Sequence, residues 1–194
     1  MRRKTPRERL LLAVLALAVL LPALTARSVL AGDFYVAAGL GDEVEDGEFG
    51  EPFKELGIEA EDRAWKALVG LDLGEHLAVE VAFQDFGERV CCPGLADAGF
   101  VTSLEGVSAA VVGRLPLDRL ELFAKAGLLL WEEDGTGMTI IGPQTLSADG
   151  SDPLFGVGAT FDLVERFALR AEWESFDLGE ASGDTFWLGI EIRF

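Results

Sequence analysis

The last ten residues alternate strictly between two kinds of side chain, and this pattern constrains the fold more than any other feature of the chain. The apolar members are Phe186, Leu188, Ile190, Ile192 and Phe194, and the residues between them are Trp187, Gly189, Glu191 and Arg193. Successive side chains of a β-strand point to opposite faces, whereas a helix repeats about every 3.6 residues. The segment therefore predicts a strand that separates an oily environment from a polar one.

Seven earlier segments repeat this alternation. Their expected bounds are 33–41, 64–73, 77–87, 106–115, 120–131, 153–163 and 167–178. The connections at 74–76, 116–119 and 164–166 are short, and those at 42–63, 88–105, 132–152 and 179–184 are longer. Short turns at one end and long loops at the other are typical of an up-and-down meander, so we predict an all-β, eight-stranded antiparallel barrel. No later stretch has 18 consecutive apolar residues, which excludes a helical membrane protein.

The beginning of the chain has the order of a secretory signal. Residues 2–9 are rich in Arg and Lys, residues 10–24 are apolar, and Ser28-Val29-Leu30-Ala31 follows them. The apolar run is shorter than the stretch of about 20 residues that a spanning helix needs, so an uncleaved anchor is the less favoured alternative. We expect residues 1–31 to be a signal peptide that is removed, and residues 32–194 to be one exported barrel domain.

The charge and composition exclude several classes of protein. The chain carries 16 basic and 34 acidic residues, a net charge of −18, and such a surface repels nucleic acid. A hydrophobic share of 49% excludes a disordered chain. There is one His, His76 in a short connection, and there are two Cys, so neither a zinc site nor a His-based catalytic centre is expected. We predict no enzyme activity and no cofactor.

The non-apolar faces of the predicted strands carry five basic and seven acidic residues together with many glycines. These charged residues are Lys66, Asp72, Glu80, Arg114, Glu121, Lys125, Asp162, Arg170, Glu172, Glu174, Glu191 and Arg193. A soluble barrel, the alternative, would put its apolar face inside. Near-balanced charge with glycine instead suits a narrow polar lumen in which side chains pair. The network that we predict to close the lumen comprises Lys66, Glu80, Arg114, Glu121, Lys125, Arg170, Glu172, Glu191 and Arg193.

Aromatic residues lie near several strand ends, as in the interfacial girdle of a membrane barrel. They are Phe34, Trp65, Trp131, Phe161, Phe167, Trp187 and Phe194, although not all of them can face lipid. Strands of about 9–11 residues also match the thickness of an outer membrane. These features favour a membrane barrel over a soluble one.

The chain resembles the OmpA-like transmembrane β-barrel family of Gram-negative outer membranes over nearly all of its predicted mature segment. The resemblance rests on AWKALVGLDLGEHLAVEVAFQDFGE (64–88), LELFAKAGLLLWEED (120–134), DPLFGVGATFDLVERFALRAEWESFDLG (152–179) and the terminal strand. It implies periplasmic chain ends, an outer-membrane location, and contacts with outer-membrane lipids and lipopolysaccharide. Phe194 resembles the family's signal for the outer-membrane assembly machinery, although Ile192 stands where an aromatic residue is common. The chain stops after the last strand, so peptidoglycan binding is not expected.

The function expected from this family is a structural or surface-interaction role with a closed lumen. Eight strands leave an interior that side chains can fill, and inward charges would fill it further. The alternative is a narrow, porin-like channel for ions or small solutes. Some small outer-membrane barrels are enzymes that use a His-assisted centre near the outer surface, but His76 lies at the opposite end.

Two features of the predicted loops each allow more than one interpretation. Residues 42–63 hold ten acidic residues, and carboxylates bind Ca²⁺ and Mg²⁺, so divalent cations are candidate partners of the acidic loops. Cys91 and Cys92 are adjacent, and they form either a vicinal disulfide or two separate thiols. Adjacent Cα atoms lie about 3.8 Å apart across a trans peptide, closer than a disulfide usually requires, so such a ring is strained.

Overall fold

The computed structural model describes residues 33–43, 64–95, 98–139, 142–178 and 181–194, with the backbone alone at 42–43, 88–95, 98–100, 102, 138–139, 177–178 and 181–182. The eight strands are β1 (Phe34–Glu43), β2 (Ala64–Gly74), β3 (Leu77–Leu95), β4 (Ala98–Leu117), β5 (Leu120–Thr139), β6 (Gly142–Val164), β7 (Phe167–Leu178) and β8 (Ala181–Arg193). The predicted signal peptide lies outside the described residues.

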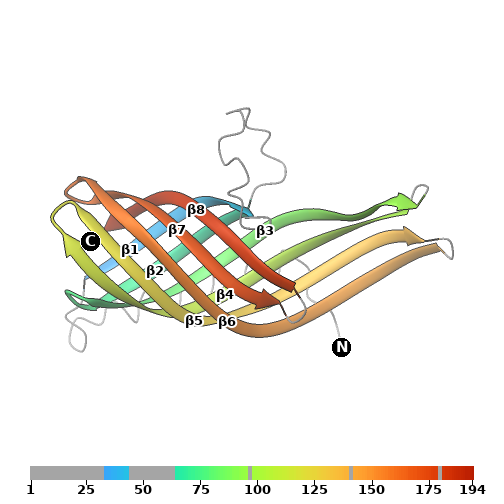
Figure 1. Cartoon of the computed structure of the whole chain (residues 1–194), viewed down its shortest axis with the longest axis horizontal. Helices are drawn as coiled ribbons and strands as arrows, with labels where there is room; N and C mark the ends of the chain where they lie inside the picture. Colours follow the sequence, from blue (N-terminus) through green and yellow to red (C-terminus); the bar gives the residue numbers. More distant parts are fainter. Residues whose placement is uncertain (1–32, 44–63, 96–97, 140–141, 179–180) are drawn as a thin grey trace. The chain divides into compact units, whose positions relative to one another are not determined.

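Each strand pairs antiparallel with the next, and β8 pairs with β1 to close the barrel (Figure 1). The closing register places Ala38 opposite Ile190 and Gly39 opposite Gly189. The three short connections lie at one end of the barrel together with the first and last residues of the barrel segment, and we call this the turn end. The opposite end of the barrel, where the strands meet the longer connections, is the loop end. The predicted all-β, eight-stranded antiparallel barrel is therefore confirmed.

Backbone hydrogen bonds tie the turn end together. The Arg114 amide donates to the His76 carbonyl at 2.9 Å, and the Asp162 amide donates to the Arg119 carbonyl at 2.8 Å. Asp118, in the β4–β5 turn, has a φ of 59°, a left-handed conformation that Asp tolerates better than most residues. The short connections are thus held against the neighbouring hairpins.

The strands of two hairpins are much longer than predicted. We expected strand ends near 87, 106, 131 and 153, but β3 continues to Leu95, β4 begins at Ala98, β5 continues to Thr139 and β6 begins at Gly142. The regions 88–105 and 132–152 lack a clean apolar alternation, as is typical of strand segments that do not have one face against an apolar environment. The four strands β3–β6 therefore continue beyond the barrel as a sheet, which Figure 1 shows as two long hairpins.

The two faces of the barrel wall have inverted polarity compared with a soluble protein. Large apolar side chains are exposed on the outside, among them Leu40, Val111, Leu115, Leu128, Leu130, Phe155 and Val157. Charged side chains are buried inside, and they include Lys66, Glu80, Lys125, Arg170, Glu172, Glu174 and Glu191. An apolar exterior around a charged interior suits a barrel surrounded by lipid. Among the described residues, no helix is long and apolar enough to cross a membrane.

Bulky inward side chains lie against glycines of the neighbouring strand. The five register pairs are Tyr35–Gly70, Trp187–Gly41, Phe123–Gly158, Trp131–Gly150 and Phe176–Gly183. A Cβ atom at any of these glycines would overlap the ring of its partner. Glycine within a strand often marks such a close approach. Trp131 and Trp187 therefore belong to the interior, and their assignment to an interfacial girdle was wrong.

Candidate functional site: the barrel interior

Six ionic side chains from β2, β3, β5 and β7 form the central ion cluster. Its members are Lys66, Glu80, Lys125, Arg170, Glu172 and Glu174, and none is more than 5% exposed. The Nζ atom of Lys66 lies 2.9 Å from Oε1 of Glu172 and 2.7 Å from Oε1 of Glu174. Lys125 contacts the same two oxygen atoms. Two ammonium groups therefore share two carboxylates in the middle of the barrel.

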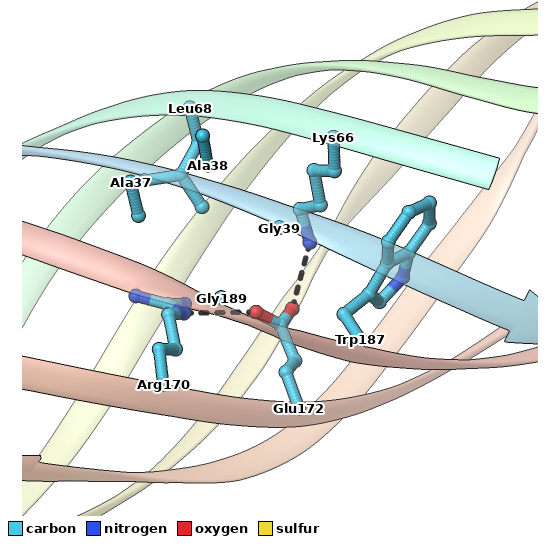
Figure 2. A pocket seen from close by; sticks show the side chains of 9 residues that line it. All are labelled: Ala37, Ala38, Gly39, Lys66, Leu68, Arg170, Glu172, Trp187 and Gly189. Atoms are coloured by element: carbon cyan, nitrogen blue, oxygen red, sulfur yellow. Dashed lines mark hydrogen bonds and ion pairs between the residues drawn. The ribbon is translucent and has the colours of Figure 1, made fainter. Parts of the chain in front are cut away.

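Arg170 connects this cluster to its neighbours. Its guanidinium lies 2.8 Å from Oε1 of Glu80, 3.0 Å from Oε2 of Glu172 and 2.9 Å from Oε2 of Glu191. Figure 2 shows Glu172 between Arg170 and Lys66, with an ion pair on each side. A buried charge is tolerated when it is paired and hydrogen-bonded, which is the state of this Arg.

Aromatic rings supply further support for the buried cations. The guanidinium of Arg170 lies 4.3 Å from the ring centre of Phe123, and that of Arg114 lies 4.5 Å from the ring centre of Tyr35. The hydroxyl of Tyr35 donates a 2.7 Å hydrogen bond to Glu80. Cations over aromatic faces are attracted by the ring quadrupole, so the rings stabilise the cations as well as filling space.

A second layer of ion pairs lies nearer the turn end and is wetter. Arg193 bridges Glu191 at 2.8 Å and Asp162 at 3.0 Å, and Arg114 lies 2.8 Å from Asp72. The side chains of Arg193 and Asp162 are 29% and 40% exposed. Glu121 completes the layer, at 3.5 Å from Arg193 and 3.8 Å from Arg114. This end of the lumen is therefore open to water.

The loop-end side of the central ion cluster is closed by apolar side chains, which we call the apolar plug. It consists of Phe86, Leu104, Leu129, Leu154, Phe176 and Trp187, one from each strand from β3 to β8. The ring of Phe86 lies 5.1 Å from that of Phe176 and 6.0 Å from that of Trp187. Each residue is at most 7% exposed. The plug is thus a dry layer stacked directly on ionic groups.

A small cavity lies beside the central ion cluster, along β1 and β8. It is bordered by Lys66, Arg170, Glu172 and Trp187, beside the paired glycines of β1 and β8 (Figure 2). Its volume is about 20 Å³, which accommodates about one water molecule.

The structure brings all nine residues of the predicted lumen network into ion pairs. It adds Asp72, Asp162 and Glu174, whose inward position the alternation also predicts. The apolar plug was missed, although the period of two places its residues on the same face as the charges. Tyr35 was also missed, because residues 34–41 carry no charge that fixes which face of the first strand points inward.

The side chains of Cys91 and Cys92 and the acidic segment 44–63 lie outside the described residues. Within the described strands and turns, no three His, Cys, Asp or Glu side chains are arranged to hold a metal ion.

Comparison with known proteins identifies the class. The family model for the outer membrane protein beta-barrel domain matches residues 11–194, and the chain belongs to this family. It is a family of bacterial outer-membrane barrels and not of enzymes. The expected outer-membrane location is thereby confirmed. No curated protein matches the chain.

Solved structures share the fold at low sequence identity. A major outer membrane protein of Thermus thermophilus is 14% identical, with a TM-score of 0.63, over 84% of this chain and all of that one. Ail, the attachment invasion locus protein of Yersinia pestis, is 18% identical with a TM-score of 0.59, over 84% and 99%. Neisserial surface protein A is 13% identical with a TM-score of 0.57, over 83% and 97%. These similarities concern the fold.

Proposed function

We propose that this chain is a closed outer-membrane barrel with a structural and surface-interaction role, and not a channel. The observation that carries the proposal is the stacking of the apolar plug on the central ion cluster. An ion that crosses the plug must leave its hydration shell, which costs several kcal/mol or more in an apolar layer. The ion pairs beneath the plug then block the remaining cross-section.

Single-channel recording in planar lipid bilayers tests the closed lumen. We expect no conductance steps for the unmodified barrel. The double variant Phe86→Ala, Phe176→Ala removes two plug rings and should introduce a leak. Phe155→Ala is the matched control, because Phe155 is 58% exposed on the outer wall and its loss leaves the plug intact. Regular conductance steps from the unmodified protein would instead support the narrow channel.

The interaction role rests on the loop end, which the family topology places outside the cell. The charged side chains that the structure describes at this end are all acidic: Asp85, Glu105, Glu132, Glu133, Asp134, Asp149, Asp152 and Asp184. Four of them are register neighbours across β3–β6, in the order Asp85, Glu105, Glu132, Asp149. A surface of this charge favours cationic partners, including divalent cations.

The acidic loop end bears on whether a ligand of one structural relative could bind this chain. Ail has been crystallised with sucrose octasulfate, a heparin analogue. A polyanion would be repelled by the acidic loop end described here, so heparin binding is not part of our proposal. The exposed apolar wall contacts the outer-membrane lipids, and Phe194 serves as the signal for the assembly machinery.

A further inference from the structure

The indole ring of Trp131 is held in a defined position near the loop end, outside the ion pairs of the lumen. Its Nε1 atom donates a hydrogen bond to Oδ2 of Asp152 on β6. A Cβ atom at Gly150 would lie 2.6 Å from Cζ2 of the ring, so the ring lies across this glycine. The ring also packs against the apolar plug. A hydrogen bond and packing therefore fix the orientation of an aromatic side chain that the closed lumen does not require.

Part of this ring remains accessible. Trp131 is partly exposed, whereas the six residues of the plug are buried. Its register neighbours on β4 and β6 are Gly106 and Gly150, so neither adjacent strand places a side chain beside it in its own row. Trp131 follows the plug residue Leu129 by two positions toward the loop end. The plug therefore does not separate the ring from the outside of the barrel.

Two carboxylates lie on the same face of the sheet as the ring. Glu133 follows Trp131 by two positions on β5, and Asp152 is the register neighbour of the inward Leu129. Both carboxylates are partly exposed. Among the described residues, no Lys or Arg pairs with either of them. This face therefore combines an aromatic ring with negative charge that the described cations leave unneutralised.

The interior of the barrel shows which group fits such surroundings. The guanidinium of Arg170 lies over the ring of Phe123, that of Arg114 lies over the ring of Tyr35, and each also contacts carboxylates. A guanidinium is planar, so it stacks on an aromatic face while it donates N–H groups to carboxylates at the ring edge. Trp131 has the ring and the carboxylates of such a pair, and the guanidinium is the component that is missing.

A divalent metal ion fits this face less well. Calcium takes six to eight oxygen ligands, and magnesium requires an octahedral shell. Glu133 and Asp152 are two side chains, and no group of three acidic, His or Cys side chains suited to a metal occurs in the described part of the chain. An aromatic ring adds nothing to a metal site, whereas it attracts an organic cation.

We propose that Trp131, Glu133 and Asp152 form a binding site for a guanidinium group, presented by an arginine side chain of a partner polypeptide. The guanidinium stacks on the accessible part of the indole ring and donates hydrogen bonds to the two carboxylates. This inference rests on the proposed surface-interaction role, and it names the chemical group that the acidic loop end recognises. The site uses side chains alone.

The test uses the full barrel in lipid nanodiscs, labelled with fluorotryptophan, and N-acetyl-arginine amide as the probe. The Trp131→Phe variant identifies the Trp131 signal in the fluorine NMR spectrum. We expect the probe to shift this signal saturably and to leave the signal of Trp173 unchanged, because Trp173 lies beside Val157 on the outer wall. N-acetyl-citrulline amide has nearly the same shape without the charge, and it should bind about tenfold more weakly or worse.

Variants of the protein locate the site. Glu133→Gln and Asp149→Asn each remove one negative charge from the same pair of strands, but Asp149 pairs with Glu132 and so lies on the opposite face from Glu133. Glu133→Gln should weaken binding severalfold, and Asp149→Asn should bind like the unmodified barrel. Asp152→Asn retains an acceptor for the indole N–H but loses the charge, so it should also weaken binding. Urea unfolding confirms that each variant is folded.

Several outcomes would overturn the guanidinium site. Absence of a saturable shift at Trp131 would remove the site itself, and equal weakening by Glu133→Gln and Asp149→Asn would reduce it to general charge attraction. Equal binding of the citrulline analogue would show that the ring stacks without regard to charge. Free arginine carries a carboxylate that the two acids repel, so tighter binding of free arginine than of the probe would make a free amino acid the ligand.

A separate measurement reports on the proposed surface-interaction role. Oligolysine binding to the same nanodiscs depends on the net charge of the loop end and not on the ring of Trp131. If oligolysine binds while the arginine probe leaves the Trp131 signal unchanged, the guanidinium site is wrong and the preference for cationic partners stands. If oligolysine does not bind, the proposed role itself fails.

Discussion

The ring of Phe194 stacks on the ring of Phe34, with the ring centroids 4.7 Å apart and the ring planes 7° apart. The Phe194 amide also donates a 3.0 Å hydrogen bond to the Phe34 carbonyl. The last residue of the chain is therefore attached to the first strand of the barrel, at the seam between β1 and β8. Both rings remain partly exposed, so the stack contributes about 0.5–1.5 kcal/mol.

Two variants can separate the role of Phe194 in outer-membrane assembly from its contribution to the stability of the folded barrel. We expect deletion of Phe194 to lower the amount of barrel in the outer membrane more than it lowers folded stability. Phe34→Ala removes the same stack but retains the terminal phenylalanine, so its yield should stay close to normal. Cell fractionation with heat-modifiable gel mobility measures the yield, and urea unfolding measures stability. Equal yields for both variants would show that Phe194 has no separate assembly role.

Glu172 should be coupled to the cations around it. It pairs with Lys66, Lys125 and Arg170, so Glu172→Gln leaves an excess of buried positive charge. We expect a loss on the order of 3–5 kcal/mol, less where water reaches the lumen. A second change, Lys125→Gln or Arg170→Gln, should recover part of this loss. A double-mutant cycle on urea unfolding measures the coupling, and strictly additive effects would contradict the paired network.

Partly exposed ion pairs at the turn end should be weaker than buried ones. Asp162 is 40% exposed and pairs with Arg193, so Asp162→Asn should cost about 0–1 kcal/mol and even less in high salt. Glu191 is fully buried between Arg170 and Arg193, and Glu191→Gln should cost several times more. Urea unfolding at two salt concentrations provides the comparison. Equal costs would mean that water reaches both positions alike.

The free-energy cost of a substitution at Gly70 should depend on whether the ring of Tyr35 is present. A side chain at residue 70 would overlap the tyrosine ring, so Gly70→Ala should destabilise the barrel by about 1–3 kcal/mol. In a Tyr35→Ala background the same change should be nearly neutral. Gly113→Ala is the matched control, since a Cβ there meets only the Ala124 carbonyl at 3.9 Å. If Gly70→Ala cost the same in both backgrounds, the ring would not be the cause.

The alternation of side chains predicted most of the fold, because the period of two is fixed by strand geometry. It placed Glu191 and Arg193 on one face and Ile190 and Ile192 on the other, as the structure has them. It could not predict that Lys66 on β2 meets Glu172 on β7, since contacts across the lumen depend on the stagger of all eight strands.

Both errors concern where water reaches the strands. We assumed that the inward face is polar throughout, so the inward Phe86, Leu129 and Phe176 were left without a role. A lumen that is closed at one end has a dry layer. In that layer apolar side chains point inward, at the same alternate strand positions that elsewhere carry the charged side chains. The extensions of β5 and β6 were missed for the opposite reason, since both of their faces meet water and neither shows an apolar stripe.

In each glycine–ring pair of the interior, the two positions on adjacent strands share a fixed space, so their combined side-chain volume is limited. At Phe123 and Gly158, a larger residue at one position is accommodated only when its partner shrinks. Substitutions inside this barrel should therefore be accepted in cross-strand pairs, even where the pair is separated by many residues along the chain. Barrels of this shape can then diverge to low identity while their cross-sections stay filled, and a position-by-position alignment would record only unrelated changes.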